Sequence, residues 1–200
     1  GKVDYINLHC DFFKVIHENY SDIFADNLKV LEKIYLYFDE QARHFDYDLE
    51  VLKIILSYNA NFITDLLKYS LDEKDYLSRR DFDENDFKKL WDLENSLIIF
   101  DNMINYLVKF KSVFVRGASE MTKVFRGNNE GEINFLKEKL TSTTDTKMVV
   151  LIFNIITTIY RDRMLEFLTI IMDKGCSLEQ FKKLDFYTSA GVTMGSRLPN

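Results

Sequence analysis

Proline is nearly missing from this chain, and that shortage limits the possible folds more than any other feature. The one proline, Pro199, stands next to the last of 200 residues. At the usual frequency of ~5%, a chain of this length would hold about ten prolines. Because proline interrupts helices and strands, its absence predicts long unbroken elements. We therefore do not expect a many-turned β-sandwich or a glycine-rich nucleotide-binding α/β fold, and the low count of seven glycines agrees.

Apolar residues recur at steps of three and four through most of the sequence, which is the spacing of one face of an α-helix. The predicted helices cover residues 5–20, 23–45, 49–71, 84–111, 133–140, 146–173 and 178–184. This pattern predicts an all-α fold of seven to eight helices, arranged as an armadillo/HEAT-like helical stack or an irregular helical bundle. We expect one helical domain over residues 1–186 and a C-terminal tail or linker over residues 187–200, where no helical face can be drawn.

The same spacing predicts which side chains face the core. In the first helix the expected inward residues are Tyr5, Leu8, Phe12, Val15, Ile16 and Tyr20. In helix 49–71 they are Leu52, Ile55, Leu56, Phe62, Ile63, Leu66 and Leu67. In helix 84–111 they include Phe87, Leu90, Leu97, Ile98, Phe100 and Ile104. Helix 146–173 is apolar on nearly all sides over its first half, so we expect it at the centre of the fold, with Gly175 as its stop.

One internal similarity leaves two interpretations open. Residues 27–31 (Asn-Leu-Lys-Val-Leu) resemble residues 48–52 (Asp-Leu-Glu-Val-Leu). Helical repeats of about 40 residues build armadillo and HEAT solenoids. Two capped amphipathic helices also look alike without any repeat.

The charges are divided unevenly along the chain. Residues 1–100 hold 12 Lys and Arg against 21 Asp and Glu, a net of −9, whereas residues 101–200 hold 14 against 11, a net of +3. The acidic half disfavours nucleic-acid binding, which needs a clustered positive face. Two distant cysteines, Cys10 and Cys176, make no disulfide framework, so we expect a cytoplasmic protein. The longest uncharged apolar run, residues 148–160, is too short to span a membrane.

No motif predicts catalysis, a metal or a cofactor. The run from Asp81 begins like a calcium loop, but Asp86 stands where glycine is needed and Asp92 where a bidentate glutamate is needed. His9, Cys10 and His17 lack further ligands at a zinc spacing. We therefore expect no enzyme activity, no metal and no cofactor, although an enzyme of unfamiliar design stays an alternative.

The predicted function is an intracellular protein-interaction module, a scaffold, adaptor or regulator that binds a partner segment in a groove between helices. The candidate partner-binding residues form a basic and aromatic cluster: Lys109, Lys111, Arg116, Lys123, Arg126, Phe110 and Phe114, with Phe125 beside them. Aromatic residues make up 14% of the chain, so some are expected at the surface, with Tyr35, Tyr37, Tyr58, Tyr69 and Tyr76 as candidates. The alternative is a membrane-surface or lipid-binding helical bundle that uses the more basic C-terminal half.

Overall fold

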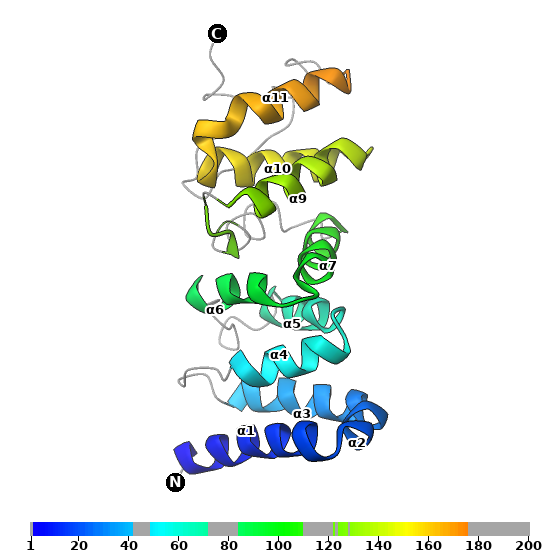
Figure 1. The fold of residues 1–200 in the computed structure, drawn as a ribbon, viewed down its shortest axis with the longest axis vertical. Coiled ribbons are helices and arrows are strands. Elements are labelled where there is room, and N and C mark those ends of the chain that lie inside the picture. Colours follow the sequence, from blue (N-terminus) through cyan, green and yellow to red (C-terminus); the bar gives the residue numbers. More distant parts are fainter. Residues whose placement is uncertain are drawn as a thin grey trace. The chain divides into compact units, whose positions relative to one another are not determined.

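The prediction of an all-α fold is confirmed (Figure 1). The computed structural model describes residues 2–41, 49–71, 84–109, 122, 124–127 and 129–175. Within these residues it forms ten α-helices, eight of them at least seven residues long, and no strand. The chain divides into two compact units, residues 1–81 with 89–103, and residues 82–88 with 104–200. One domain over residues 1–186 stays a prediction, and helix 178–184 and the tail at 187–200 lie outside the described residues.

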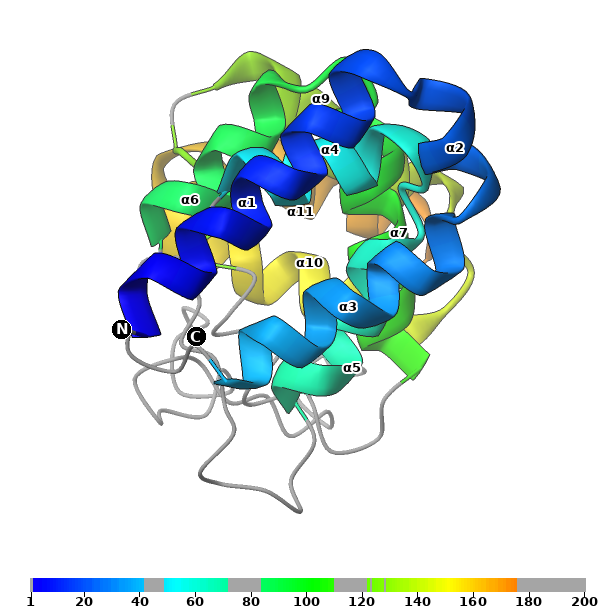
Figure 2. The ribbon, with the colours of Figure 1, turned by 90° about the horizontal axis from the view of Figure 1, so that it is seen from below.

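The first unit is built around α4. Its elements are α1 (Lys2–Asn19), α2 (Ser21–Asp26), α3 (Leu28–Gln41), α4 (Leu49–Tyr58), α5 (Phe62–Leu71), the 3₁₀ turn η1 (Leu90–Asp92) and the first half of α7 (Ser96–Lys109). Both α1 and α3 pack on α4, and α4 packs on α5. In Figure 2, α2 joins one end of α1 to α3, and the rings of Phe13 and Tyr35, on α1 and α3, meet edge to face at 6.5 Å. All seven inward residues predicted for 49–71 are buried.

The second unit has α10 (Thr146–Ile159) at its centre, as the sequence predicts. Its other described elements are α6 (Glu84–Lys89), the second half of α7, α9 (Glu130–Ser142), the 3₁₀ turn η2 (Arg161–Arg163) and α11 (Met164–Asp173). α10 packs against both α9 and α11, and every residue from Met148 to Thr157 is buried. The Asp145 side chain accepts the Lys147 N–H at 2.8 Å, which caps α10 at its first turn.

Four predicted helices are each divided by a bend, which is why the helices outnumber the prediction. Helix 23–45 divides at Asn27 into α2 and α3. Helix 49–71 breaks at Asn59, whose side chain accepts the Asn61 N–H at 3.2 Å. Helix 84–111 breaks over residues 93–95, where Asn95 Nδ2 donates to the Leu56 carbonyl at 2.8 Å. Asparagine side chains compete with the helix ladder for backbone partners, so they favour such turns. Helix 146–173 breaks at Tyr160, which leaves the helical conformation with φ −115° and ψ 41°.

The predicted inward face of the first helix is wrong at Phe12, Val15 and Tyr20, which are exposed. Ile16 is half-buried, and the side chains of Tyr5 and Leu8 lie outside the described set. Phe13 is 2% exposed and packs against Phe24 and Tyr35, while Phe12 and Val15 lie on the solvent side. The same error occurs in α7, where Ile99 is buried and both Leu97 and Ile98 are exposed. In both places apolar residues are adjacent in sequence, so the spacing alone fits more than one helical face.

The end of α11 is fixed by two features. Gly175 has φ +75°, the left-handed conformation that was expected to stop the helix. Beside it, the Lys174 ammonium donates hydrogen bonds to the carbonyls of Leu140, Thr141 and Thr143 at the C-terminal end of α9. A cation at a helix C-terminus satisfies carbonyls that have no partner within the helix.

Candidate functional site

Most of the predicted basic and aromatic cluster lies outside the described residues. Lys111, Arg116, Lys123, Phe110 and Phe114 fall there, so that cluster stays a prediction. Lys109 is exposed at the end of α7. Arg126 Nε and Nη2 donate to the Lys88 carbonyl at 3.0 and 2.6 Å, which ties Arg126 to the end of α6. Phe125 is buried, with its ring edge to face against Tyr160 at 6.5 Å, and therefore belongs to the core.

His17, one of the residues weighed as a metal ligand, is engaged within the first unit. Its Nδ1 lies 2.9 Å from the Tyr58 hydroxyl, and its ring meets Phe24 edge to face at 6.0 Å. The side chains of His9 and Cys10 lie outside the described set. Across the side chains that the structure describes, no group of three or more His, Cys, Asp or Glu could hold a metal ion.

A buried carboxyl group joins three segments of the second unit. Glu132, on α9, is 1% exposed. Its Oε2 accepts the Arg126 backbone N–H at 2.9 Å and the Tyr160 hydroxyl. Glu132 Oε1 is buried without a hydrogen-bond partner among the described residues. Burial raises the pKa of Glu132, because an ionised carboxylate is poorly solvated there, and the two hydrogen bonds oppose the rise.

The same contact affects Tyr160. Burial and the adjacent Glu132 carboxylate both raise the pKa of its phenol, so Tyr160 stays protonated and acts as the donor. The bend that ends α10 at Tyr160 is thus the place where α10 is bonded to α9. The pair is sealed from solvent, so it holds the fold together and is not accessible to a substrate.

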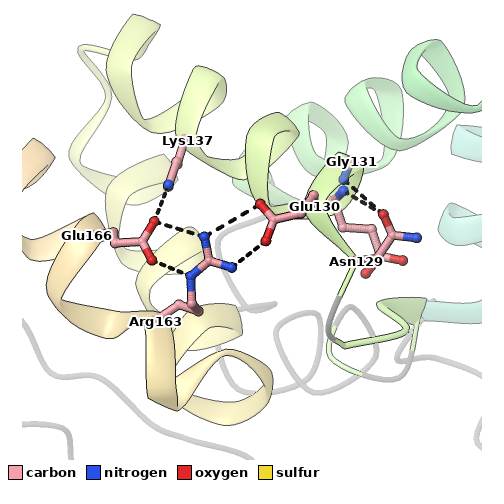
Figure 3. Close-up of polar contacts among 7 residues, drawn as sticks. Asn129, Glu130, Gly131, Lys137, Arg163 and Glu166 are labelled. Atoms are coloured by element: carbon pink, nitrogen blue, oxygen red, sulfur yellow. Dashed lines mark hydrogen bonds and ion pairs between the residues drawn. The ribbon is translucent and has the colours of Figure 1, made fainter.

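An ion-pair network joins α9 to α11 at the surface (Figure 3). Arg163 Nη1 donates to Glu130 at 2.6 Å and Nη2 donates to Glu166 at 3.0 Å, while Lys137 bonds the same Glu166 carboxylate. The bonds from Arg163 and Lys137 lower the pKa of Glu166 to about 2. Arg163 also lowers the pKa of Glu130, whose helix begins after the Asn129 cap. Every charge in the network has a partner, so the network positions the two helices.

The described feature best suited to binding is an apolar surface on the first unit. We define the α1–α3 apolar surface as Phe12, Val15, Tyr20, Ile23, Val30 and Tyr37, each between 47% and 58% exposed. On α1, Phe12 comes one residue before the buried Phe13, and Val15 comes two residues after it. On α3, Val30 comes one residue before the buried Leu31, and Tyr37 comes two residues after the buried Tyr35. Both helices pack on α4, and Figures 1 and 2 show α1, α2 and α3 together on the same side of α4.

The aromatic candidates from the sequence divide between core and surface. Tyr37 belongs to the exposed set, Tyr35 is buried and Tyr58 is half-buried, with its ring stacked on Phe24 at 4.6 Å. Tyr69 and Tyr76 lie outside the described side chains. The apolar spacing of the sequence predicts Phe12, Val15 and Tyr20 in the core, so this surface could not be found from that spacing. The adjacent apolar pair Phe12–Phe13 was the available signal, because a helix cannot bury both on one narrow stripe.

No helix in the described part of the chain is long and apolar enough to cross a membrane. Comparison of the chain with protein-family models, with curated proteins and with solved structures finds no match.

Proposed function

We propose that this protein is a cytoplasmic protein-interaction module, a scaffold, adaptor or regulator that binds a segment of a partner along its helices. The proposal includes an armadillo/HEAT-like stack or an irregular bundle as the framework. The observation that carries it is the α1–α3 apolar surface, where six large side chains on neighbouring helices are each about half exposed. Large apolar residues gathered on one surface are typical of binding sites, whereas single exposed ones are common everywhere.

The composition of this surface supports the same proposal. Three of its six residues, Phe12, Tyr20 and Tyr37, are aromatic. Aromatic residues are enriched in the buried centres of protein interfaces, where they contribute large contact areas. The core beneath the surface is closely packed, with Phe13, Phe24 and Tyr35 all buried. A rigid base of this kind keeps the exposed residues in place before a partner arrives, which lowers the entropic cost of binding.

The experiment places a photo-crosslinking amino acid at Val15 or Val30 in the full chain, expressed in its own cells. The matched control position is Leu165, which is exposed on α11 in the second unit. We expect one protein to crosslink from positions 15 and 30 and not from position 165. Purified, that protein should bind the wild-type chain and lose affinity for a Phe12→Ser, Val15→Ser variant. Equal crosslinking from all three positions, or undiminished binding by the variant, would contradict the proposal.

Binding to a membrane surface is the second candidate, supported by the net charge of +3 over residues 101–200. Attraction of this kind to anionic lipids is electrostatic and is screened by salt. Co-sedimentation with anionic vesicles that disappears at high salt, and that Lys109→Glu weakens, would favour this candidate. Sedimentation that does not depend on salt or on Lys109 would count against it.

A further inference from the structure

The exposed acidic side chains around the α1–α3 apolar surface indicate which kind of segment it takes. Between residues 11 and 26 the exposed charged residues are Asp11, Glu18, Asp22 and Asp26. Lys14 is the one lysine or arginine in that range and is half-buried, so with His17 neutral the stretch carries −4 + 1 = −3. None of the four carboxylate side chains forms a hydrogen bond or ion pair within the part of the chain that the structure describes.

These carboxylates lie along the apolar residues. On α1, Asp11, Val15 and Glu18 follow one another at steps of four and three, which places them on one side of the helix. On α2, Asp22 comes before Ile23 and Asp26 comes after it. The two aspartates are four residues apart, so they lie on the same face of the helix. A segment laid along α1 and α2 therefore meets apolar side chains with negative charges next to them on the same helix sides.

We propose that the α1–α3 apolar surface binds an amphipathic helix that carries lysine or arginine beside its apolar stripe, an inference that rests on the proposed function. Large side chains three and four residues apart on α1 form ridges that pack against another helix. No strand edge exists among the described residues to pair with an extended peptide. Positive charge on the partner complements the four carboxylates.

Charge argues against the other occupants. In a symmetric pair of copies the same patch lies on both sides, so a contact centred on α1 and α2 would bring Glu18 and Asp22 toward the same carboxylates of the second copy. Anionic lipid headgroups would meet the same repulsion. On α3, Lys29 is paired with the buried Glu32 at 3.2 Å, and the exposed Lys33 lies three residues after Val30 and four before Tyr37. That positive charge is outnumbered by the four carboxylates on α1 and α2.

The test uses two synthetic helical peptides of about 18 residues, or five turns, with identical leucine stripes. One carries lysine beside the stripe and the other carries glutamate. Binding of each labelled peptide to the full chain is measured by fluorescence anisotropy. We expect the lysine peptide to bind about tenfold more tightly at low salt, and the ratio to shrink as screening increases. Replacing Asp11, Glu18, Asp22 and Asp26 with lysine should reverse the preference.

Controls separate this inference from the proposed function. A Glu138→Lys variant changes an exposed charge on α9 and should keep the preference for the lysine peptide. Circular dichroism checks that each variant keeps its helix content. If the fourfold variant does not, the single variants Glu18→Lys and Asp22→Lys are measured instead. Each should reduce the ratio of the affinities for the lysine and glutamate peptides. If both peptides bind equally and Phe12→Ser with Val15→Ser abolishes both, the charge inference is overturned and the proposed function stands.

Two further outcomes would overturn the inference. Binding of neither peptide would contradict it, and the crosslinking experiment would then decide the proposed function separately. Co-sedimentation of the wild-type chain with phosphatidylserine vesicles, lost on Phe12→Ser with Val15→Ser, would assign the surface to lipid. We expect no such sedimentation through this surface.

Discussion

Replacing Tyr160 with phenylalanine tests whether the buried bond to Glu132 holds α10 against α9. The substitution removes one hydroxyl and leaves the ring, which packs edge to face on Phe125. Glu132 Oε2 then loses the phenol and keeps the Arg126 backbone N–H, at 2.9 Å. A hydrogen bond to a charged group contributes about 1.5–3 kcal/mol when its loss leaves a buried acceptor unsatisfied. We therefore expect Tyr160→Phe to cost about 2 kcal/mol at neutral pH, or a fall in Tm of about 4–8 °C.

The loss of stability in Tyr160→Phe should depend on pH, and the direction of that dependence follows from the pKa of Glu132. Burial raises the pKa of Glu132, and the Tyr160 bond opposes that rise, so Tyr160→Phe moves the pKa of Glu132 higher still. The folded variant then binds a proton more readily than the unfolded chain, whose glutamate keeps its ordinary value near 4.5. Its stability therefore rises as pH falls from the raised pKa toward that value. The difference in free energy of unfolding between the variant and the wild type should therefore become smaller at acidic pH.

Thermal and urea unfolding followed by circular dichroism, at neutral pH and at a pH near the ordinary glutamate pKa, measure both effects. Tyr20→Phe is the matched control, because Tyr20 is 56% exposed and its hydroxyl should contribute under about 0.5 kcal/mol. A loss under about 0.5 kcal/mol for Tyr160→Phe at neutral pH would refute the stabilising role of the bond. An equal loss at both pH values would refute the argument that the bond acts on ionised Glu132.

Three further substitutions test other contacts by thermal unfolding. Asp145→Ala removes the cap of α10 and should cost about 1 kcal/mol, while the adjacent exposed Thr144→Ala should cost little; equal losses would contradict the capping role. Phe167 is fully buried, so Phe167→Ala should lower the free energy of unfolding by about 3–5 kcal/mol. Leu165 is 77% exposed, so Leu165→Ala should lower it by about 0.5 kcal/mol or less. Similar losses for the two variants would show that the outward side of α11 is covered. The pKa of Glu166 is lowered to about 2, so the stability that its ionised form contributes is present above pH 4.5 and is lost as the pH falls toward 2. Glu166→Gln should therefore make Tm less dependent on pH between 4.5 and 2. An unchanged pH dependence of Tm would argue against the network.

The sequence predicts the fold well where its apolar pattern has one solution. Helix α10 is apolar on nearly all sides, so any rotation buries it, and its predicted central position is confirmed for the second unit. The bends at Asn59 and Tyr160 could not be predicted from periodicity, because the apolar spacing continues across both. They depend on partners distant in sequence, since Asn59 Nδ2 donates to Glu32 at 2.7 Å and Tyr160 donates to Glu132.

The candidate site was harder to predict than the fold, for a related physical reason. Phe12 and Phe13 have equal hydrophobicity, and the choice of which to bury is made by Phe24 and Tyr35, which pack against Phe13. A helical pattern read along one segment holds no information about those contacts. The acidic residues Asp11, Glu18 and Asp22 contributed to the predicted negative charge of the N-terminal half, but their position beside exposed apolar side chains requires the structure.

The contact of Lys174 with the end of α9 sets a practical limit on how the second unit can be divided. The ammonium group of Lys174 bonds carbonyls at 140, 141 and 143, more than thirty positions earlier in the chain. A fragment that stops at Asp173 would contain the whole of α11 and still leave those carbonyls without their cation. For expression of this unit alone, the functional boundary of α11 therefore lies beyond the last helical residue, at Gly175 or later.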